Sequence, residues 1–396
     1  MAANELSINQ ISTLINAVCE QATGRRSIEV TNTSDFVAVA NTVLKTGYDP
    51  TIQAISQVLS KSIFSNRPYS RKFKSLEATN QAYGNHVRKL QMCDSEFEND
   101  KRFELVDGQS VDQYKVKKPD VIQTNIYGQN VRQYQAPTIF KDQLDTALSG
   151  PEEFAQFMAM QTTNTNDQIE KMHEECARAT VANLIGGVIA GGKAESKVHL
   201  LTEYNAYLGL SGNEALTKVT IRRPENFIPF IKWVYARIET LMGLLSERSK
   251  LFHVTPNDKN LQRHTGKADI NAYLFASLEN DISASVLADT YHKDLLKLPG
   301  HEKVNFWQSI EDGSRDKIKV DAGYIDATGA PTHSEVEQSD IVGVLFDREA
   351  AGYTTVNTWS SPSPFNANGG YTNIFYHFTD RHWNDFTENV IVLLLD

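Results

Sequence analysis

Hydrophobic positions in the first 65 residues follow the three-to-four-residue spacing of amphipathic helices, which predicts three short helices. The second helix is expected to end before Gly47. The third is expected to begin at Asp49-Pro50, where an N-cap residue and a first-turn proline coincide. The apolar positions that carry this spacing are Leu6, Ile11, Leu14, Ile15, Val18, Phe36, Val39, Val43, Leu44, Ile52, Ile55, Leu59 and Ile63. We therefore expect residues 1–65 to form a helical arm.

A much longer helix is predicted over residues 151–186. Gly150-Pro151 supplies a small residue and a first-turn proline, and Glu152-Glu153 places negative charge at the positive end of the helix dipole. The apolar stripe that follows stops at the glycine pair 186–187. About 35 residues make a helix roughly 50 Å long, which exceeds the need of one compact domain. The polar run 161–166 in its middle is a candidate position for a kink or a break.

The rest of the chain mixes helices with strands. An amphipathic pattern predicts a second strong helix from Pro224 to about Leu245, and residues 270–278 are also expected to be helical. Continuous apolar runs predict buried strands at 341–346 and 389–395, and an aromatic-rich run predicts another at 371–378. This order of elements is typical of a mixed α+β chain.

Residues 66–135 lack the apolar content of a core and carry segregated charge. From Lys61 to Cys93 there are seven basic residues and one acid, whereas from Asp94 to Asp112 there are seven acids and two bases. Such a stretch fits a long hairpin whose charges meet complementary charges on neighbouring molecules. A solvated loop with unrelated blocks of charge is an equally good interpretation of the pattern.

The composition of the chain excludes several classes of protein. The chain has 396 residues, 40% hydrophobic and 22% charged, which is ordinary for globular domains, and no apolar run is long enough to span a bilayer. The residues after Met1 lack the basic and apolar regions of a signal peptide, so we expect folding in the cytosol. Three widely spaced cysteines, Cys19, Cys93 and Cys176, do not predict a disulfide framework. The net charge of −10 argues against a dedicated reader of DNA sequence.

The strongest enzyme-like feature is the glycine-rich stretch from Gly187 to Lys193. It fits the phosphate-cradling pattern G-x-x-x-x-G-K, but Ala194 follows it and has no hydroxyl for magnesium. A phosphate loop also links a strand to the start of a helix, whereas these glycines follow the long helix. A helix stop with a flexible linker is the favoured interpretation.

Two further groups of residues have some chemical potential. His173 and Cys176 lie three residues apart on the long helix and could share a metal ion, although no second ligand pair at a recognisable spacing accompanies them. His377 and His382 flank Asp380 near the end of the aromatic-rich run, without the spacing of a nucleophile and its base. Packing is the favoured role for all of them, and we expect no catalytic constellation and no enzyme.

Several local patterns, together with the order of the elements, resemble the tailed-bacteriophage major capsid proteins of the Hong Kong 97-like fold. Residues 340–349 look like the late strand and acidic turn of the capsid proteins of small short-tailed phages, the podoviruses of the Picovirinae type. Residues 370–378, followed by a polar turn and the strand at 389–393, are similar to the same proteins. The passage from 125–148 into Gly150-Pro151 also resembles that family's transition from extended loop to spine helix.

The resemblance implies a complete domain layout. It places the N-terminal helical arm at 1–65, an extended β-hairpin loop at 66–135, and a peripheral domain at 136–222 that contains the spine helix. The axial domain, around a capsomer centre, falls at 223–345, and the C-terminal strands at 346–396 are expected to return to the peripheral domain.

The resemblance also implies a function and partners. The chain is expected to assemble into pentamers and hexamers of an icosahedral shell that encloses phage double-stranded DNA without sequence-specific binding. The implied partners are a separate scaffolding protein, a portal protein at one vertex and decoration or head-fibre proteins, with no cofactor and no membrane. Assembly is expected in the host bacterial cytoplasm. The charged loop residues expected at intersubunit contacts are Arg71, Lys72, Lys74, Arg88, Lys89, Glu96, Glu98, Asp100 and Glu104.

Two alternatives remain open from the sequence. A cellular nanocompartment shell, similar to the encapsulins, would share the fold and hold enzymes instead of a genome. A phosphate-binding enzyme using Gly187 to Lys193 is the alternative from a different class of protein.

Overall fold

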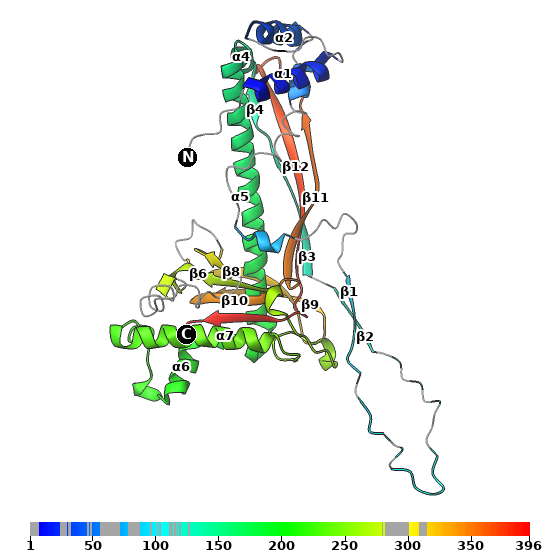
Figure 1. The fold of residues 1–396 in the computed structure, drawn as a ribbon, viewed down its shortest axis with the longest axis vertical. Helices are drawn as coiled ribbons and strands as arrows, with labels where there is room; N and C mark the ends of the chain where they lie inside the picture. The colour runs from blue at the N-terminus through cyan, green and yellow to red at the C-terminus, as the bar shows by residue number, and fades with distance from the viewer. Residues whose placement is uncertain are drawn as a thin grey trace.

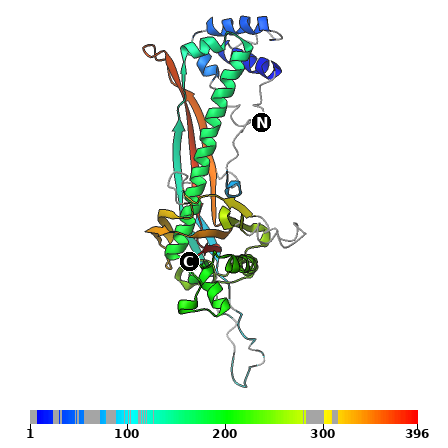
Figure 2. The same ribbon diagram turned by 90° about the vertical axis from the view of Figure 1, so that its left-hand side faces the viewer.

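One long helix, α5 (Pro151–Gly191), is the axis of the molecule and joins a tip lobe to a lower lobe (Figure 1). Figure 2 shows a sheet lying along α5 between the two lobes. None of the helices among the described residues is both long and apolar enough to cross a membrane. The computed structural model describes residues 8–23, 30, 33–45, 47, 50–55, 72–77, 88–95, 97–100, 102, 104–110, 114, 116, 118, 120–125, 127–278, 280–281, 301–308 and 315–396.

Helix α5 is longer and more regular than its sequence pattern predicted. The polar run 161–166 does not break it, since the helix is continuous through this stretch and buries Thr165 and Asn166. It also continues through Gly186-Gly187 to Gly191, so the predicted end at 186 was wrong. The glycines lie inside the helix because this end of the helix packs closely against neighbouring strands.

Glycines at the end of α5 allow the helix to approach the hairpin of β8 (Ile318–Ile325) and β9 (Pro331–Gln338) closely. A Cβ atom at Gly187 would lie 2.4 Å from the ring of Phe386 and 3.0 Å from the side chain of Tyr324. A Cβ at Gly186 would lie 2.7 Å from Val320. These contacts are too short for any side chain, so close helix–sheet packing outweighs the poor helix propensity of glycine.

Replacing one of these glycines with alanine should separate the effect of packing on stability from the effect of helix propensity. We expect Gly187→Ala to destabilise the chain by about 1–3 kcal/mol, because the new methyl group overpacks a filled site. Gly243, inside α7 (Pro224–Leu245), is the matched control, since no atom lies within 4 Å of the position that a Cβ would take there. Gly243→Ala should stabilise the chain by about 0.5–1 kcal/mol. Denaturant unfolding measures the change in the free energy of unfolding for each variant. Changes of the same sign in the two variants would contradict the packing argument.

The tip lobe gathers the N-terminal helices around the first turns of α5. Its helices have the bounds α1 (Ile8–Thr23), α2 (Thr33–Lys45) and α4 (Lys141–Ala147), and residues 50–55 are also helical. Phe36 and Phe154 are fully buried there, with ring centroids 5.8 Å apart. Two of the three predicted N-terminal helices are thereby confirmed, and most of the third lies outside the described residues.

An antiparallel sheet runs beside α5 from the tip lobe to the lower lobe (Figure 2). Its strand order is β11-β12-β3, and β4 pairs with the other end of β12. Alternate residues of β12, such as Ile374 and Tyr376, are buried in the tip core. The bounds are β3 (Tyr127–Gln135), β4 (Thr138–Phe140), β11 (Ala351–Pro362) and β12 (Tyr371–Asn384).

The lower lobe is built on a five-stranded sheet of order β5-β13-β10-β6-β7. Helices α6 (Leu200–Leu208) and α7 cover one face, and the last turns of α5 contribute to the core on the other. Because both faces are covered, the central strands are continuously apolar. The bounds are β5 (Lys197–His199), β6 (Ile270–Phe275), β7 (His301–Val304), β10 (Ile341–Asp347) and β13 (Val390–Leu394).

One sequence expectation is corrected by this sheet. The stretch 270–278 was predicted to be helical, but 270–275 is the strand β6, whose Tyr273 contributes to one core and whose neighbours contribute to the other. The C-terminal strands expected in the peripheral domain divide between two sheets, since β11 and β12 lie in the sheet beside α5 and β13 pairs with β10 in the lower lobe. Strand β5, from the segment expected in the same domain, pairs with β13 in the lower sheet, and the domain boundary at 222 stays a prediction.

Part of the predicted loop 66–135 forms a projecting hairpin. Strand β1 (Arg88–Met92) pairs antiparallel with β2 (Val121–Asn125), and the segment between them extends past the lower lobe (Figure 1). Strand β3 follows at once and pairs with β12, so residues 127–135 belong to the sheet beside α5. The hairpin that the structure describes spans 88–125, and residues 66–71 and 78–87 of the predicted loop lie outside the described residues.

Candidate functional site

Polar contacts fix the base of the hairpin to the lower lobe. The backbone N–H of Asp94 donates to the carbonyl of Asn260 at 2.7 Å, and the Asp94 carboxylate accepts from the backbone N–H of Gln262 at 2.9 Å. On the other strand, Lys259 Nζ donates to Asp120 Oδ1 at 2.7 Å. Both strands are thus held at the point where the hairpin leaves the body.

Lys89 on β1 is the most buried of these anchors. Its Nζ lies 2.9 Å from Asp385 Oδ2 and also contacts Glu388, and both carboxylates are nearly fully buried. Burial opposes the charge of the lysine, but the two carboxylates outweigh it and raise the pKa of Lys89 above its ordinary value. Beside it, Gln91 Nε2 donates to Thr387 Oγ1 at 3.1 Å. Lys89 was predicted at an intersubunit contact, and this stays a prediction, while within its own chain its charge is engaged by these two carboxylates.

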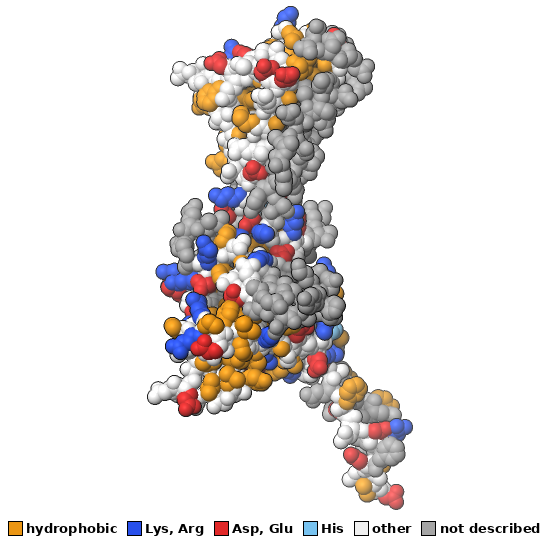
Figure 3. Space-filling model, turned by 60° about the vertical axis from the view of Figure 1, so that its left-hand side comes forward, with side chains coloured by type: hydrophobic (Ala, Val, Ile, Leu, Met, Phe, Trp, Pro, Cys, Tyr) orange, Lys and Arg blue, Asp and Glu red, His pale blue; other side chains and the backbone are white. Residues whose placement is uncertain are grey.

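Beyond the anchors, the hairpin exposes large apolar side chains. Figure 3 shows them on the projecting hairpin together with basic and acidic groups. Met92 and Val121 form an exposed cross-strand pair at the end of the two strands. The apolar side chains of the projecting segment that are more than half exposed are Phe97, Leu105, Val106, Tyr114 and Val116. A narrow hairpin has no interior in which to bury them.

The predicted acidic residues of the projecting segment that the structure describes, Glu98, Asp100 and Glu104, are all exposed. Asp100 accepts hydrogen bonds from Arg102, whose guanidinium lowers the pKa of the carboxyl group. Arg71 and Glu96 lie outside the described residues, and Arg88 is described only by its place in β1.

The predicted basic residues Lys72 and Lys74 lie on the body, in a segment that includes the short helix η1 (Lys74–Leu76). Phe73 between them is buried in the lower core. Ser75 Oγ lies 2.6 Å from the hydroxyl of Tyr273, which joins this segment to β6. Both lysine side chains are exposed, so a fixed segment of the body presents two positive charges to solvent.

The glycine-rich stretch does not have the geometry of a phosphate loop. Gly187 and Gly191 lie inside α5 and contact aromatic side chains, and Lys193 Nζ donates to the carbonyl of Lys250 at 2.5 Å. Backbone N–H groups within a helix are already bonded and cannot cradle a phosphate. The phosphate-binding enzyme is therefore not favoured.

The aromatic run on β12 divides between two faces. Tyr376 and Phe378 are buried in the tip core, whereas His377 stacks on the half-exposed Trp359 with ring centroids 3.9 Å apart. Sequence reasoning missed this stacked pair, since Trp359 comes from β11 and no local pattern links the two residues.

Comparisons with known proteins agree with this architecture. The capsid structure of Staphylococcus phage Andhra has a TM-score of 0.55 and 9% identity, covering 84% of this chain and 86% of that chain. A structure of head fiber and inner core protein gp22 of native bacteriophage P68 has a TM-score of 0.52 and 10% identity, covering 83% and 85%. These likenesses show a shared fold, the Hong Kong 97-like fold expected from the sequence.

The family comparison extends over nearly the whole chain. No curated protein sequence matches significantly. The family model described as Phi29-like phage major capsid protein, however, matches residues 15–394, which include the spine helix, the hairpin and both lobes. The chain therefore belongs to the Phi29-like phage major capsid protein family.

Proposed function

We propose that this major capsid protein assembles by laying the hairpin of each subunit over a neighbouring subunit, in rings of five and six that close an icosahedral shell. Family membership makes the chain a structural protein of the phage shell, located in the virion capsid. The observation that carries the proposed mode of assembly is the projecting hairpin, which is fixed at its base and apolar beyond it.

The apolar residues of the hairpin require a cover that their own chain does not provide. Phe97 is fully exposed, and Tyr114 and Val116 are each at least 80% exposed. Burying such surface yields about 25 cal/mol per Å². A second copy of the chain is the occupant that fits, since every copy offers the same hairpin and the same body. Head-to-tail contacts of this kind close into rings when the rotation between neighbours is a whole fraction of a turn.

Charge on the two sides supports this arrangement. Lys72 and Lys74 are presented by the body, whereas Glu98 and Glu104 are carried by the projecting segment. Each exposed pair contributes only about 0–1 kcal/mol, but the contact is repeated at every subunit of a shell. Arg71, Arg88, Lys89 and Glu96 stay in the proposed contact set on the strength of the sequence.

We assign the domains according to the sheets. The proposed axial domain is the five-stranded sheet with α6 and α7, which includes residues 197–208 and 390–394. The proposed peripheral domain consists of most of α5 with β3, β11 and β12, and it carries the N-terminal helices at its tip.

The other proposed partners follow from the biology of a phage shell. They are a separate scaffolding protein, a portal at one vertex, head-fibre or decoration proteins, and packaged double-stranded DNA. A net charge of −10 would keep densely packed DNA from adhering to the shell. Assembly is proposed in the host bacterial cytoplasm. The nanocompartment alternative is not favoured, because the matching family is one of phage capsid proteins.

Negative-stain microscopy and sedimentation of the purified protein test this proposal. Co-expression with the scaffolding gene of the same phage should give closed shells, and the chain expressed alone should give fewer or irregular particles. A discrete small oligomer under both conditions would contradict the proposed assembly.

A further inference from the structure

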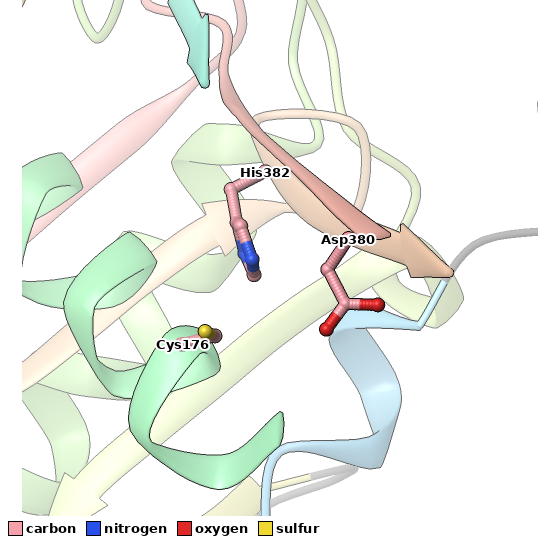
Figure 4. A group of neighbouring side chains, drawn as sticks. All are labelled: Cys176, Asp380 and His382. Carbon is pink, nitrogen blue, oxygen red and sulfur yellow. The ribbon is translucent and has the colours of Figure 1, made fainter. Parts of the chain in front are cut away.

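A cluster of metal-binding residue types, two of them buried and Cys176 partly buried, lies between α5 and β12 (Figure 4). His382 and Asp380 come from β12, two residues apart and therefore on one face of the strand, and Cys176 comes from the adjacent helix. One donor atom from each residue lies within 4.8 Å of the others. Asp380 is 99% buried and His382 is 91% buried. The capsid function described above makes no use of this cluster.

The hydrogen bonds around His382 determine which ring nitrogen carries the proton. Thr180 Oγ1 donates its single proton to the carbonyl of Cys176 at 2.9 Å. The same oxygen lies 3.0 Å from His382 Nδ1, and with its proton directed at the Cys176 carbonyl it accepts from Nδ1, the arrangement in which Nδ1 is the protonated nitrogen. Nε2 therefore carries a lone pair. A histidine oriented through one nitrogen with the other left as an acceptor is typical of metal ligands.

Two acceptor atoms in the cluster have no hydrogen-bond partner among the described residues. They are His382 Nε2 and Asp380 Oδ1, and both are buried. Buried acceptors of this kind are costly unless something binds them. The other carboxylate oxygen, Asp380 Oδ2, lies 2.9 Å from His173 Nδ1, a further buried ring nitrogen that makes no hydrogen bond among the described residues.

We propose that Cys176, Asp380 and His382 form a binding site for a divalent transition metal ion, for which Zn²⁺ is the best match. A thiolate, an imidazole and a carboxylate are the donors that zinc accepts, whereas Mg²⁺ and Ca²⁺ require oxygen donors throughout. Donor atoms around tetrahedral zinc stand about 3.5 Å apart, so the three side chains need only small adjustments to bind. The fourth position is left for water.

The charges balance when the ion binds. Binding releases the thiol proton to solvent, and the thiolate and carboxylate together neutralise the two positive charges.

An ion can reach the site from solvent. A cleft of about 400 Å³ between α5, β8 and β12 is lined by both Cys176 and His382. The bound ion would link the spine helix to the sheet beside it, in the middle of the molecule between the tip and lower cores. The site thus reinforces the joint that holds the two lobes together, and it is independent of how the subunits assemble.

Cobalt and zinc titrations of the purified full-length chain test the site. Co²⁺ should bind at one ion per chain with the thiolate-to-metal charge-transfer absorption and the visible bands of tetrahedral coordination. Zn²⁺ should displace it and raise the melting temperature by mass action. Mg²⁺ should do neither.

Single-residue variants distinguish a metal-binding site from a cluster of side chains that only pack together. Cys176→Ser should abolish the charge-transfer absorption and lower zinc affinity by more than about 100-fold, and Thr180→Val, which removes no ligand, should lower it by about 10–100-fold. Cys93→Ser is the matched thiol control and should leave the charge-transfer absorption and the zinc affinity unchanged. Circular dichroism shows whether each variant is folded. A folded wild-type chain without the thiolate absorption, or a Cys176→Ser chain that binds zinc with unchanged affinity, would overturn the proposal.

Discussion

Shortening the hairpin to its anchored base should abolish shell formation and leave the chain folded. Replacing residues 95–119 with a Gly-Ser-Gly linker keeps the pairing of β1 with β2 and the contacts of Asp94, Asp120 and Lys259. The removed segment contributes no residue to the described cores, so the free energy of unfolding should change little. Every subunit of a shell loses the same contact, so the effect on assembly should be complete. Sedimentation and microscopy with the scaffolding gene present measure it.

A full-length variant tests whether the apolar side chains of the hairpin are responsible for assembly. Replacing Phe97, Tyr114 and Val116 together with serine should also prevent closure, because it removes the surface that a neighbour would bury. The matched control replaces three exposed polar hairpin residues, Asn99, Gln109 and Ser110, with alanine, and it should assemble normally. Normal shells from the shortened chain would show that the hairpin is not the assembly contact.

Removing the charge of Lys89 should produce the largest loss of stability from a single exchange. Lys89→Met leaves the buried carboxylates of Asp385 and Glu388 without their main cation, although Arg263 remains 3.2 Å from Glu388. An uncompensated buried charge costs about 3–5 kcal/mol, and we expect about 3 kcal/mol because the lysine is partly exposed. Denaturant unfolding of the unassembled chain measures the loss.

Lys259→Met is the matched control for that measurement. It also removes a lysine that ties the hairpin to the body, but its partner Asp120 is mostly exposed. Such a pair contributes about 0–1 kcal/mol. Similar losses in the two variants would refute the view that burial of the carboxylates makes Lys89 the stronger anchor.

The candidate metal site shows where local sequence information ends. His173 and Cys176 were recognised as a possible ligand pair on one helix, and His382 and Asp380 were seen near each other about 200 residues later. Neither pair is a recognisable motif alone. The sequence does not say that β12 lies against α5, and this packing brings Cys176 within 4.8 Å of Asp380 and His382.

The glycines at 186–191 were misinterpreted for a similar reason. Glycine is a poor helix former, so the pattern predicted a helix stop at 186. The residues that require glycine there, Phe386 and Tyr324, come from parts of the chain more than 130 positions away. Their close approach outweighs the local preference.

The sequence by itself determined the long helices, the buried strands at 341–347 and 390–394, and the segregated charge of residues 61–112, because each depends on local periodicity or composition. Its resemblance to phage capsid proteins led to the family that the comparison then showed. Only the tertiary structure decided that 270–275 is a strand, that β5 and β13 join the lower sheet, and that Lys89 binds within its own chain. Those outcomes depend on pairing and burial between residues far apart in the sequence, and local pattern carries no information about such contacts.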